Sequence, residues 1–233
     1  MKVEIIASGS RGNCVVIEDE LIIDVGVEPP LKGSVVLLTH QHTDHTKALD
    51  KVQGLPIWAT RETAEALADK FPYIEFSILG SGNVYKFNTP NGKEFFVHPI
   101  KLKHDAPCIG YDITCDGERI LYATDFNEIL DEIDVRDYTA LYLECNNTLS
   151  HKDMHEVFFA DVKPKDKFHR RKSFYNHCNI GYLKSLFTRA GFDENNRCEI
   201  PLTLMHKSSY FYASNPEAVV ELCKIANVQN PLD

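Results

Sequence analysis

The chain has 233 residues, of which 43% are hydrophobic and 25% are charged, an ordinary composition for a globular protein. Its formal net charge of −9 argues against a wide basic surface for duplex nucleic acid, and no apolar run approaches the roughly 20 residues that cross a bilayer. The seven cysteines include no Cys-x-x-Cys pair, and the first six residues resemble a strand rather than a signal peptide. We therefore expect a cytoplasmic protein with no membrane partner.

Short strands dominate the predicted first half of the chain. Apolar and β-branched residues indicate strands at 2–7, 14–18, 21–25 and 34–39. The segment Ser8–Asn13, rich in turn-forming residues, separates the first two. A helix is predicted at 61–71, because apolar residues from Ala64 to Phe71 recur at helical spacing and Thr60 can cap the N-terminus.

The second half adds more strands and two further helices. Strands are predicted at 83–87, 94–100, 108–114, 119–123, 139–144 and 201–205. A helix at 180–190 has one apolar face and ends before Gly191. The last helix is predicted near 216–226, with Asn215 as its N-cap. This order predicts a single α+β domain over residues 1–233, with two β-rich halves and helices on the outside.

The segment Thr39–His45 carries the strongest functional signal. It follows a predicted buried strand and contains His40, His42, Asp44 and His45. In an extended segment His40 and His42 point the same way, and a turn into a helix near Asp44 brings the next two side chains toward them. Imidazole and carboxylate groups suit zinc and related divalent metals. The alternative is a polar turn with solvated histidines, but four candidate ligands after a buried strand favour a metal site.

Three further candidate ligands stand at the ends of other predicted strands. His104 follows the run from Val97 to Lys103, Asp125 follows the strand at 119–123, and His206 follows the strand at 201–205. If these strand ends share one rim, the three side chains join the histidine motif. Taken singly, each has an alternative: a solvated histidine, or a helix N-cap in the case of Asp125.

Together these segments resemble the metallo-β-lactamase superfamily, whose mark is His-x-His-x-Asp-His after a strand. The resemblance covers most of the chain and includes Ile22–Gly26, His104, Thr124–Asp125 and His206. Within the superfamily the chain is most similar to the WalJ-type (YycJ-type) hydrolases, which are predicted exonucleases or phosphodiesterases. The fold that the resemblance implies is the four-layer αββα sandwich.

Four segments carry the closer, WalJ-type resemblance: Ser8–Cys14, His104–Ala106, Glu144–Asn147 and Asn176–Asn179. The chain departs from that pattern at Asn127 and Asn176, where glycine is usual, and at Asn147, where histidine is usual. The substrate rim therefore matches the subfamily less closely than the metal ligands match the superfamily.

The resemblance implies two bound divalent metal ions. By position, His40, His42 and His104 would bind one ion, Asp44, His45 and His206 the other, and Asp125 would bridge them. Zinc is the default for imidazole-rich sites, although manganese or iron also fits. Asp24 would orient a ligand imidazole, with a simple turn aspartate before Gly26 as the alternative.

Such a dinuclear centre predicts hydrolysis by a metal-bound hydroxide. Asp44 and His177 are the predicted catalytic residues, with His177 donating to the scissile phosphate or the leaving oxygen; a surface histidine is the alternative. The basic run Lys163–Lys172 either guides a phosphate-bearing substrate or is a solvated loop. The candidate substrate residues are Ser10, Asn146, Arg170, Arg171 and Asn179.

We interpret the sequence as that of a phosphodiesterase acting on nucleic-acid ends, as an exonuclease does, or on small or cyclic nucleotides. A homodimer is compatible with this function. One alternative is a thioester or lactone hydrolase of the same superfamily. Another is a non-catalytic, metal-binding assembly protein, which the intact ligand set disfavours.

Overall fold

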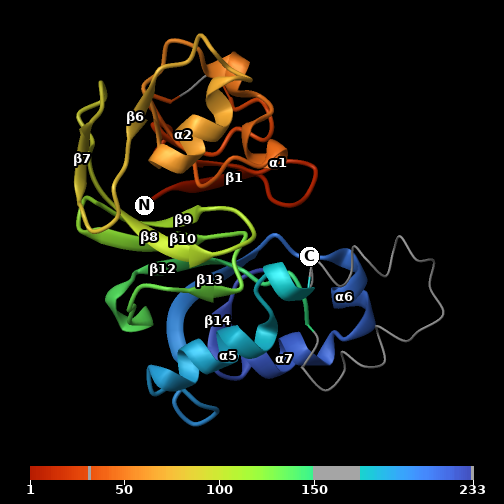
Figure 1. The fold of residues 1–233 in the computed structure, drawn as a ribbon. Coiled ribbons are helices and arrows are strands. Elements are labelled where there is room, and N and C mark those ends of the chain that lie inside the picture. The colour runs from red at the N-terminus through yellow and green to blue at the C-terminus, as the bar shows by residue number, and fades with distance from the viewer. Residues whose placement is uncertain (31–32, 149–173, 232–233) are drawn as a thin grey trace, which may run out of the picture. The chain divides into compact units, whose positions relative to one another are not determined.

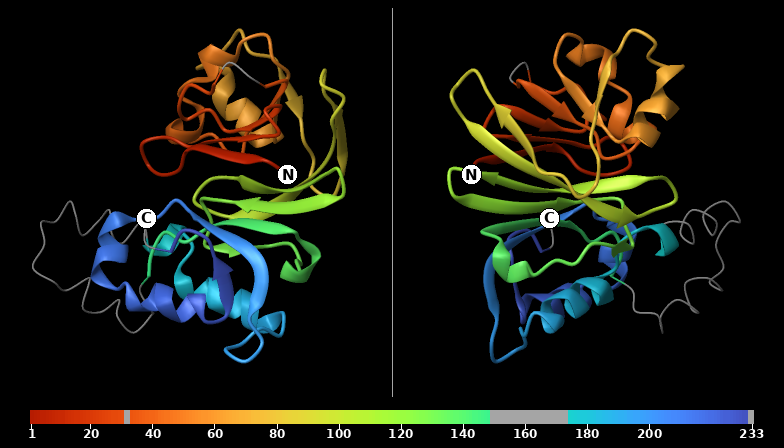
Figure 2. Two further views of the ribbon diagram at one scale, coloured as in Figure 1. Left: turned by 180° about the vertical axis from the view of Figure 1, so that it is seen from behind. Right: turned by 60° about the vertical axis from the view of Figure 1, so that its left-hand side comes forward.

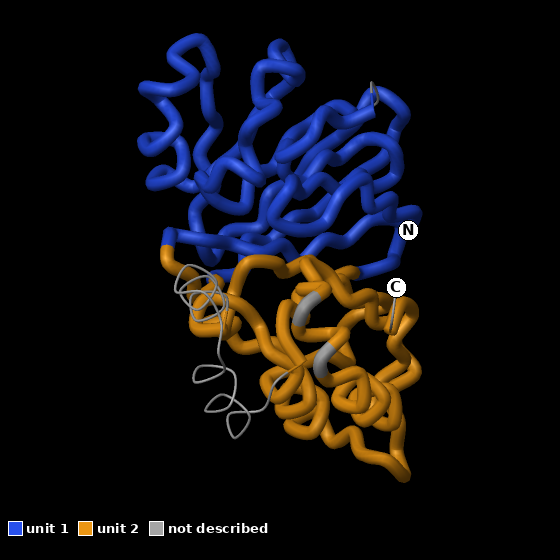
Figure 3. Tube along the Cα trace, turned by 90° about the vertical axis from the view of Figure 1, so that its right-hand side faces the viewer, with its two compact units in different colours: residues 1–101, 106–119 blue, residues 102–105, 120–233 orange. Residues whose placement is uncertain are grey.

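The structure is a computed structural model that describes residues 1–30, 33–148 and 174–231. The chain divides into two compact units (Figure 3). Unit 1 comprises Met1–Lys101 and Ala106–Arg119, and unit 2 comprises Leu102–Asp105 and Ile120–Asp233. Among the described residues, no helix is both long enough and apolar enough to cross a membrane.

Unit 1 contains a six-stranded sheet whose strands follow one another in chain order. They are β1 (Val3–Ala7), β2 (Cys14–Ile17), β3 (Leu21–Ile23), β4 (Val35–Leu37), β5 (Ile57–Ala59) and β6 (Phe76–Ile78). The pairs β1–β2 and β2–β3 are antiparallel, whereas β3 to β6 are parallel. Strands β2, β3 and β4 are buried along their whole length, which explains why their sequences are continuously apolar rather than alternating.

The helix α2 (Arg61–Ala68) packs against this sheet (Figure 1). As predicted, it begins after Thr60, whose side-chain oxygen accepts a hydrogen bond from the Thr63 N–H. The helix ends at Ala68, so the sequence pattern placed its end about one turn too late. Even so, Leu67 and Phe71 both lie in the core formed with β2 to β5, because the chain after the helix still faces the sheet.

The remaining strands of unit 1 are β7 (Tyr85–Asn88), most of β8 (Glu94–Lys103), and β9 (Cys108–Cys115). Strands β7 and β8 form an antiparallel hairpin. The strand β8 runs three residues beyond its predicted end and stops immediately before His104. This extension fixes the point at which a candidate ligand leaves the strand.

In unit 2, four strands lie side by side and parallel, with helices on one face (Figures 1 and 2). They are β10 (Glu118–Ala123, in this unit from Ile120), β12 (Ala140–Glu144), β13 (Cys198–Met205) and β14 (Ala226–Val228). The short β11 (Glu128–Ile129) pairs with the end of β8. The helices α5 (Ile180–Arg189) and α7 (Glu217–Cys223) contact each other. The carboxyl ends of parallel strands meet at one edge, where polar side chains can converge.

The predicted start of the last helix was wrong. Asn215 is the C-cap of α6 (Ser209–Ser214), a helix that the sequence pattern did not reveal, and α7 begins at Glu217 after Pro216. The proline still marks the helix start, because its missing N–H and fixed φ suit the first turn. The short strands β5, β6, β11 and β14 were also not predicted, since two or three residues are too few to show a period.

Candidate metal centre

Three of the polar residues at strand ends have a left-handed backbone. Asp24 has a φ of 58°, Asp125 of 56° and His206 of 49°. Asp24 directly follows β3, His206 directly follows β13, and Asp125 comes two residues after β10. Residues other than glycine seldom adopt this conformation, and where they do they often lie in functional sites. The backbone therefore turns sharply where the candidate site residues leave their strands.

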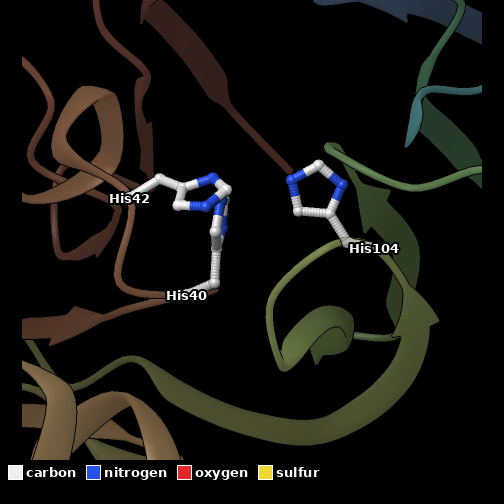
Figure 4. Close-up of side chains that lie close together, drawn as sticks. All are labelled: His40, His42 and His104. Carbon is white, nitrogen blue, oxygen red and sulfur yellow. The ribbon is translucent and has the colours of Figure 1, made fainter. Parts of the chain in front are cut away.

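In unit 1 the chain leaves β4 and enters the histidine motif. The short helix α1 (Thr43–Thr46) begins next to Asp44, which confirms the predicted turn. The ring centroids of His40 and His42 are 4.5 Å apart, and those of His40 and His45 are 4.2 Å apart. Figure 4 shows His40 and His42 on the segment after β4, and His104 on the segment that follows β8. The motif thus gathers three imidazoles within a few residues, two of them fully buried.

Asp24 orients the imidazole of His45. Its Oδ2 atom lies 2.7 Å from Nδ1 of His45, and both groups are fully buried. Because an ionised carboxylate only accepts hydrogen bonds, Nδ1 of His45 is the donor and Nε2 keeps a lone pair. The Thr39 N–H also donates to Asp24, at 2.9 Å, and the Thr39 hydroxyl lies 3.0 Å from Nδ1 of His40. Asp24 is therefore more than a turn aspartate.

Asn13 is a site residue that the sequence reasoning did not single out. It is 1% exposed, and its Oδ1 accepts a hydrogen bond from the Gly9 N–H. Its Nδ2 lies 2.9 Å from Nε2 of His45 and 3.5 Å from Oδ2 of Asp44. The signal for Asn13 was its place in the segment Ser8–Cys14. Ser10, the residue predicted from that segment, is exposed.

The end of the opening loop packs directly on the histidine motif. The Asn13 N–H donates to the Asp44 carbonyl oxygen at 2.7 Å, and the Val25 N–H donates to that of His45 at 2.8 Å. At Gly26 there is room only for hydrogen, because a Cβ atom would lie 1.6 Å from the Asp44 carbonyl oxygen. This close packing fixes the backbone of the two candidate ligands in α1.

In unit 2, one carboxylate holds two imidazoles. Glu144 ends β12 and is fully buried. Its Oε1 lies 2.6 Å from Nδ1 of His177 and 2.8 Å from Nδ1 of His206, while its Oε2 accepts from the Phe126 N–H at 2.8 Å. The candidate ligand atoms of Asp125, Glu144, His177 and His206 all lie within 4.8 Å of one another. Glu144 shared the strand-end pattern of Asp125, yet the sequence reasoning did not select it.

These contacts shift the pKa values of His177 and Glu144. Burial opposes a charge on His177, but the carboxylates of Glu144 and Asp125 outweigh it and raise the pKa of His177. Burial also opposes a charge on Glu144 and would raise its pKa, but His177 and His206 hold the pKa of Glu144 below its usual value. A carboxylate with a lowered pKa beside an imidazole with a raised pKa forms a natural proton-donating pair.

His104 lies at the end of β8, also in unit 2. Its Nδ1 lies 3.0 Å from the Asn176 carbonyl oxygen, and its Nε2 lies 3.0 Å from Oδ1 of Asp105. Burial lowers the pKa of His104 below its ordinary value, which keeps the ring neutral at pH 7 as a metal ligand requires. The ring centroids of His104 and His177 are 5.4 Å apart.

Two of the remaining predicted substrate residues, Asn179 and Asn146, make hydrogen bonds to the backbone. Asn179 is the N-cap of α5, and its Oδ1 accepts from the Tyr182 N–H at 3.0 Å. Asn146 is 7% exposed and donates from Nδ2 to the His206 carbonyl oxygen at 3.0 Å. Arg170 and Arg171, with the whole basic run Lys163–Lys172, lie outside the described residues.

The donor set in unit 2 fits a divalent metal ion. It combines imidazole nitrogens with the carboxylate oxygens of Asp125 and Glu144, the ligand types that zinc and its neighbours accept. His45 in unit 1 and His206 in unit 2 each have Nδ1 held by a carboxylate. That support is usual for metal-binding imidazoles, because it directs the other nitrogen toward the ion.

Several known proteins share this fold. The chain is similar to the metallo-β-lactamase fold protein YhfI from Bacillus subtilis, with 18% identity, a TM-score of 0.63, and coverage of 97% of this chain and 94% of that one. It is also similar to Zn²⁺-bound PqqB from Methylobacterium extorquens (15% identity, TM-score 0.62, 98% and 97% covered). A diphosphatase from the PhnP family matches with 15% identity and a TM-score of 0.57, over 88% of this chain and 85% of that one.

No curated protein matches the sequence. The family model described as the β-lactamase superfamily domain matches residues 27–162, which is more than half of the chain. This match agrees with the histidine motif, the strand-end carboxylates and the two sheets, and it confirms the predicted fold. The chain therefore belongs to the β-lactamase superfamily and has the metallo-hydrolase fold of that family.

Proposed function

We propose that this protein is a metal-dependent phosphodiesterase that acts on nucleic-acid ends or on small or cyclic nucleotides. The observation that carries the proposal is the pair formed by His177 and Glu144, 2.6 Å apart and next to Asp125. Cleavage of a phosphodiester expels an alkoxide, which needs a proton. A histidine with a raised pKa beside a buried carboxylate is suited to supply one.

We assign the metal ligands as the family resemblance implies. His40, His42 and His104 hold one ion, Asp44, His45 and His206 hold the other, and Asp125 is shared between the two. Zinc is the expected metal, and manganese and iron are accepted by the same ligand types. When bound, such ions lower the pKa of coordinated water and offset the negative charge of a phosphoryl group.

The protein's own residues then divide the remaining work. His177 gives the proton on Nε2 to the leaving oxygen while Nδ1 stays bound to Glu144, which stabilises the imidazolium before transfer. Asp24 holds the His45 ring through Nδ1 in the orientation that a ligand needs. Asp44 would help to hold the second metal ion. After the transfer, the imidazole of His177 regains its proton from solvent.

Two considerations favour phosphodiesters over thioesters and lactones. The chain has both Asp44 and His45, which complete a second metal position that can clamp a phosphoryl oxygen. Its opening loop and its segments around Glu144 and His177 resemble those of the WalJ-type hydrolases. One neighbour in fold is described as a diphosphatase, so the fold accommodates phosphoryl hydrolysis.

The decisive experiment is a substrate panel with protein purified without chelators. Bis-nitrophenyl phosphate, end-labelled single strands, nicked duplex and cyclic nucleotides are compared with a thioester and a lactone. We expect turnover of the phosphodiesters, its loss on chelation and its return with added zinc or manganese. Turnover of the thioester or lactone alone would assign the other hydrolase class, and bound metal without any turnover would indicate a binding protein.

A further inference from the structure

The backbone of His206 needs an explanation of its own. With a φ of 49° it has a conformation that a residue with a Cβ atom adopts only when its surroundings impose it. The imidazole contact with Glu144 fixes the ring, but it does not fix the peptide groups on either side. Something else must hold the chain at the end of β13.

Asn146 makes the contacts that can hold this turn. Its side-chain Nδ2 donates to the His206 carbonyl oxygen at 3.0 Å, and its own carbonyl oxygen accepts from the Ser208 N–H at 3.0 Å. The preceding Cys145 N–H donates to the Met205 carbonyl oxygen at 3.0 Å. Hydrogen bonds therefore fix the chain before, at and after His206.

The same asparagine also joins the segment that contains His177. The Asn146 N–H donates to the Cys178 carbonyl oxygen at 2.9 Å. Asn146 is 7% exposed, and His177 and His206 lie with their ring centroids 4.9 Å apart. Asn146 thus holds together two segments that each contain a histidine and are far apart in the sequence.

We propose that Asn146 is a positioning residue that holds His206 in its left-handed conformation and so sets the affinity of the second metal position. It acts through His206. The metal part of this inference rests on the proposed function, in which His206 is a ligand. The conformational part does not depend on metal.

The conformational part is tested with metal-free protein in excess chelator. Asn146→Ala is introduced into two backgrounds, His206→Ala and His206→Gly, and the free energy of unfolding is measured by urea titration. Glycine adopts a positive φ without the Cβ penalty, so only the His206→Ala protein recovers strain energy when the Asn146 side chain is removed and the chain relaxes. We expect Asn146→Ala to destabilise the His206→Ala protein less than the His206→Gly protein. Equal losses in the two backgrounds would overturn the proposal.

The metal part is tested by equilibrating the full-length protein with zinc against graded concentrations of a chelator. Asn146→Asp replaces the donor by an acceptor, and Asn146→Ser serves in its place if the aspartate variant does not fold. We expect one of the two zinc ions to lose affinity roughly tenfold or more, as is typical when the support of a ligand is removed, while the affinity for the other is retained.

Asn230→Ala is the matched control. Its amide makes two hydrogen bonds to the backbone of Leu204 on the same strand, at 2.8 and 3.0 Å, two residues before His206. We expect this variant to keep both zinc affinities. Unchanged affinities in the Asn146 variants, or an equal loss in Asn230→Ala, would contradict a specific role for Asn146. A parent protein that binds no zinc would instead refute the proposed function and leave the urea test standing.

Discussion

Asp24 and His45 form a fully buried contact, 2.7 Å between Oδ2 and Nδ1, that joins the end of β3 to α1. Asp24→Asn replaces a charged acceptor by an amide, so Nδ1 of His45 loses its anchor and the ring can rotate. We expect the affinity for one metal ion to fall by about tenfold to a hundredfold. Zinc competition with a chromogenic chelator measures this change.

The control for Asp24 is Asp134→Asn, which makes the same substitution at an aspartate that pairs locally with Arg136. This variant should bind zinc as the parent does. Parent-like zinc affinity in Asp24→Asn would show that the contact is structural only.

Substitutions at His177 and at Glu144 should differ in their effects on the metal content of the protein. His177→Ala removes the proposed proton donor, and we expect turnover of bis-nitrophenyl phosphate to fall by roughly tenfold or more with the metal content unchanged. Glu144→Gln also disturbs the anchor of His206. Glu144 accepts both imidazoles with Oε1 and the Phe126 N–H with Oε2, and the single neutral oxygen of an amide cannot replace both atoms. We therefore expect Glu144→Gln to lose both turnover and metal.

Metal analysis by mass spectrometry alongside initial rates distinguishes the two variants. Loss of metal in His177→Ala would make His177 a ligand rather than a donor. Parent-like rates in that variant would remove it from the reaction.

Local sequence predicted the part of the site that is local in the chain. His40, His42 and His45 follow one buried strand within six positions, so periodicity and ligand chemistry were enough. Glu144 and Asn13 were not selected, because their importance comes from segments that pack on them from elsewhere: His206 lies 62 positions after Glu144, and His45 lies 32 after Asn13. A single sequence does not show such pairings. The positive φ at Asp24, Asp125 and His206 was equally invisible, since these residue types carry no fixed backbone preference.

The raised pKa of His177 predicts how the metal-free protein responds to pH. The folded-state pKa lies above the ordinary value of 6.5, so protonated His177 stabilises the fold fully below about pH 6.5. That contribution is lost as the pH rises through the folded-state pKa. His177→Gln keeps a neutral hydrogen-bond donor and removes the titration.

Urea unfolding in excess chelator between pH 6 and 9 tests this expectation. The parent should be more stable than His177→Gln at pH 6, and the difference should shrink as the pH rises. A difference that is constant, or that grows with pH, would show that Glu144 and Asp125 do not raise the pKa in solution. The lowered pKa of His104 acts in the opposite direction, and the positive charge of His177 is one of its causes.

The packing of Gly26 on α1 predicts a steric requirement in unit 1. A methyl group there would lie 1.6 Å from the Asp44 carbonyl oxygen and 2.5 Å from the Asn13 nitrogen, both backbone atoms that cannot move independently. Gly26→Ala should therefore lower the free energy of unfolding by about 1–3 kcal/mol or more and weaken zinc binding, because Asp44 and His45 shift together. Gly80→Ala is the control, since its methyl group would meet the flexible Asn83 side chain at 3.1 Å and the Tyr85 hydroxyl at an ordinary contact distance of 3.5 Å. Urea titration with zinc competition decides the matter, and equal behaviour of the two alanine variants would refute the coupling between the opening loop and the histidine motif.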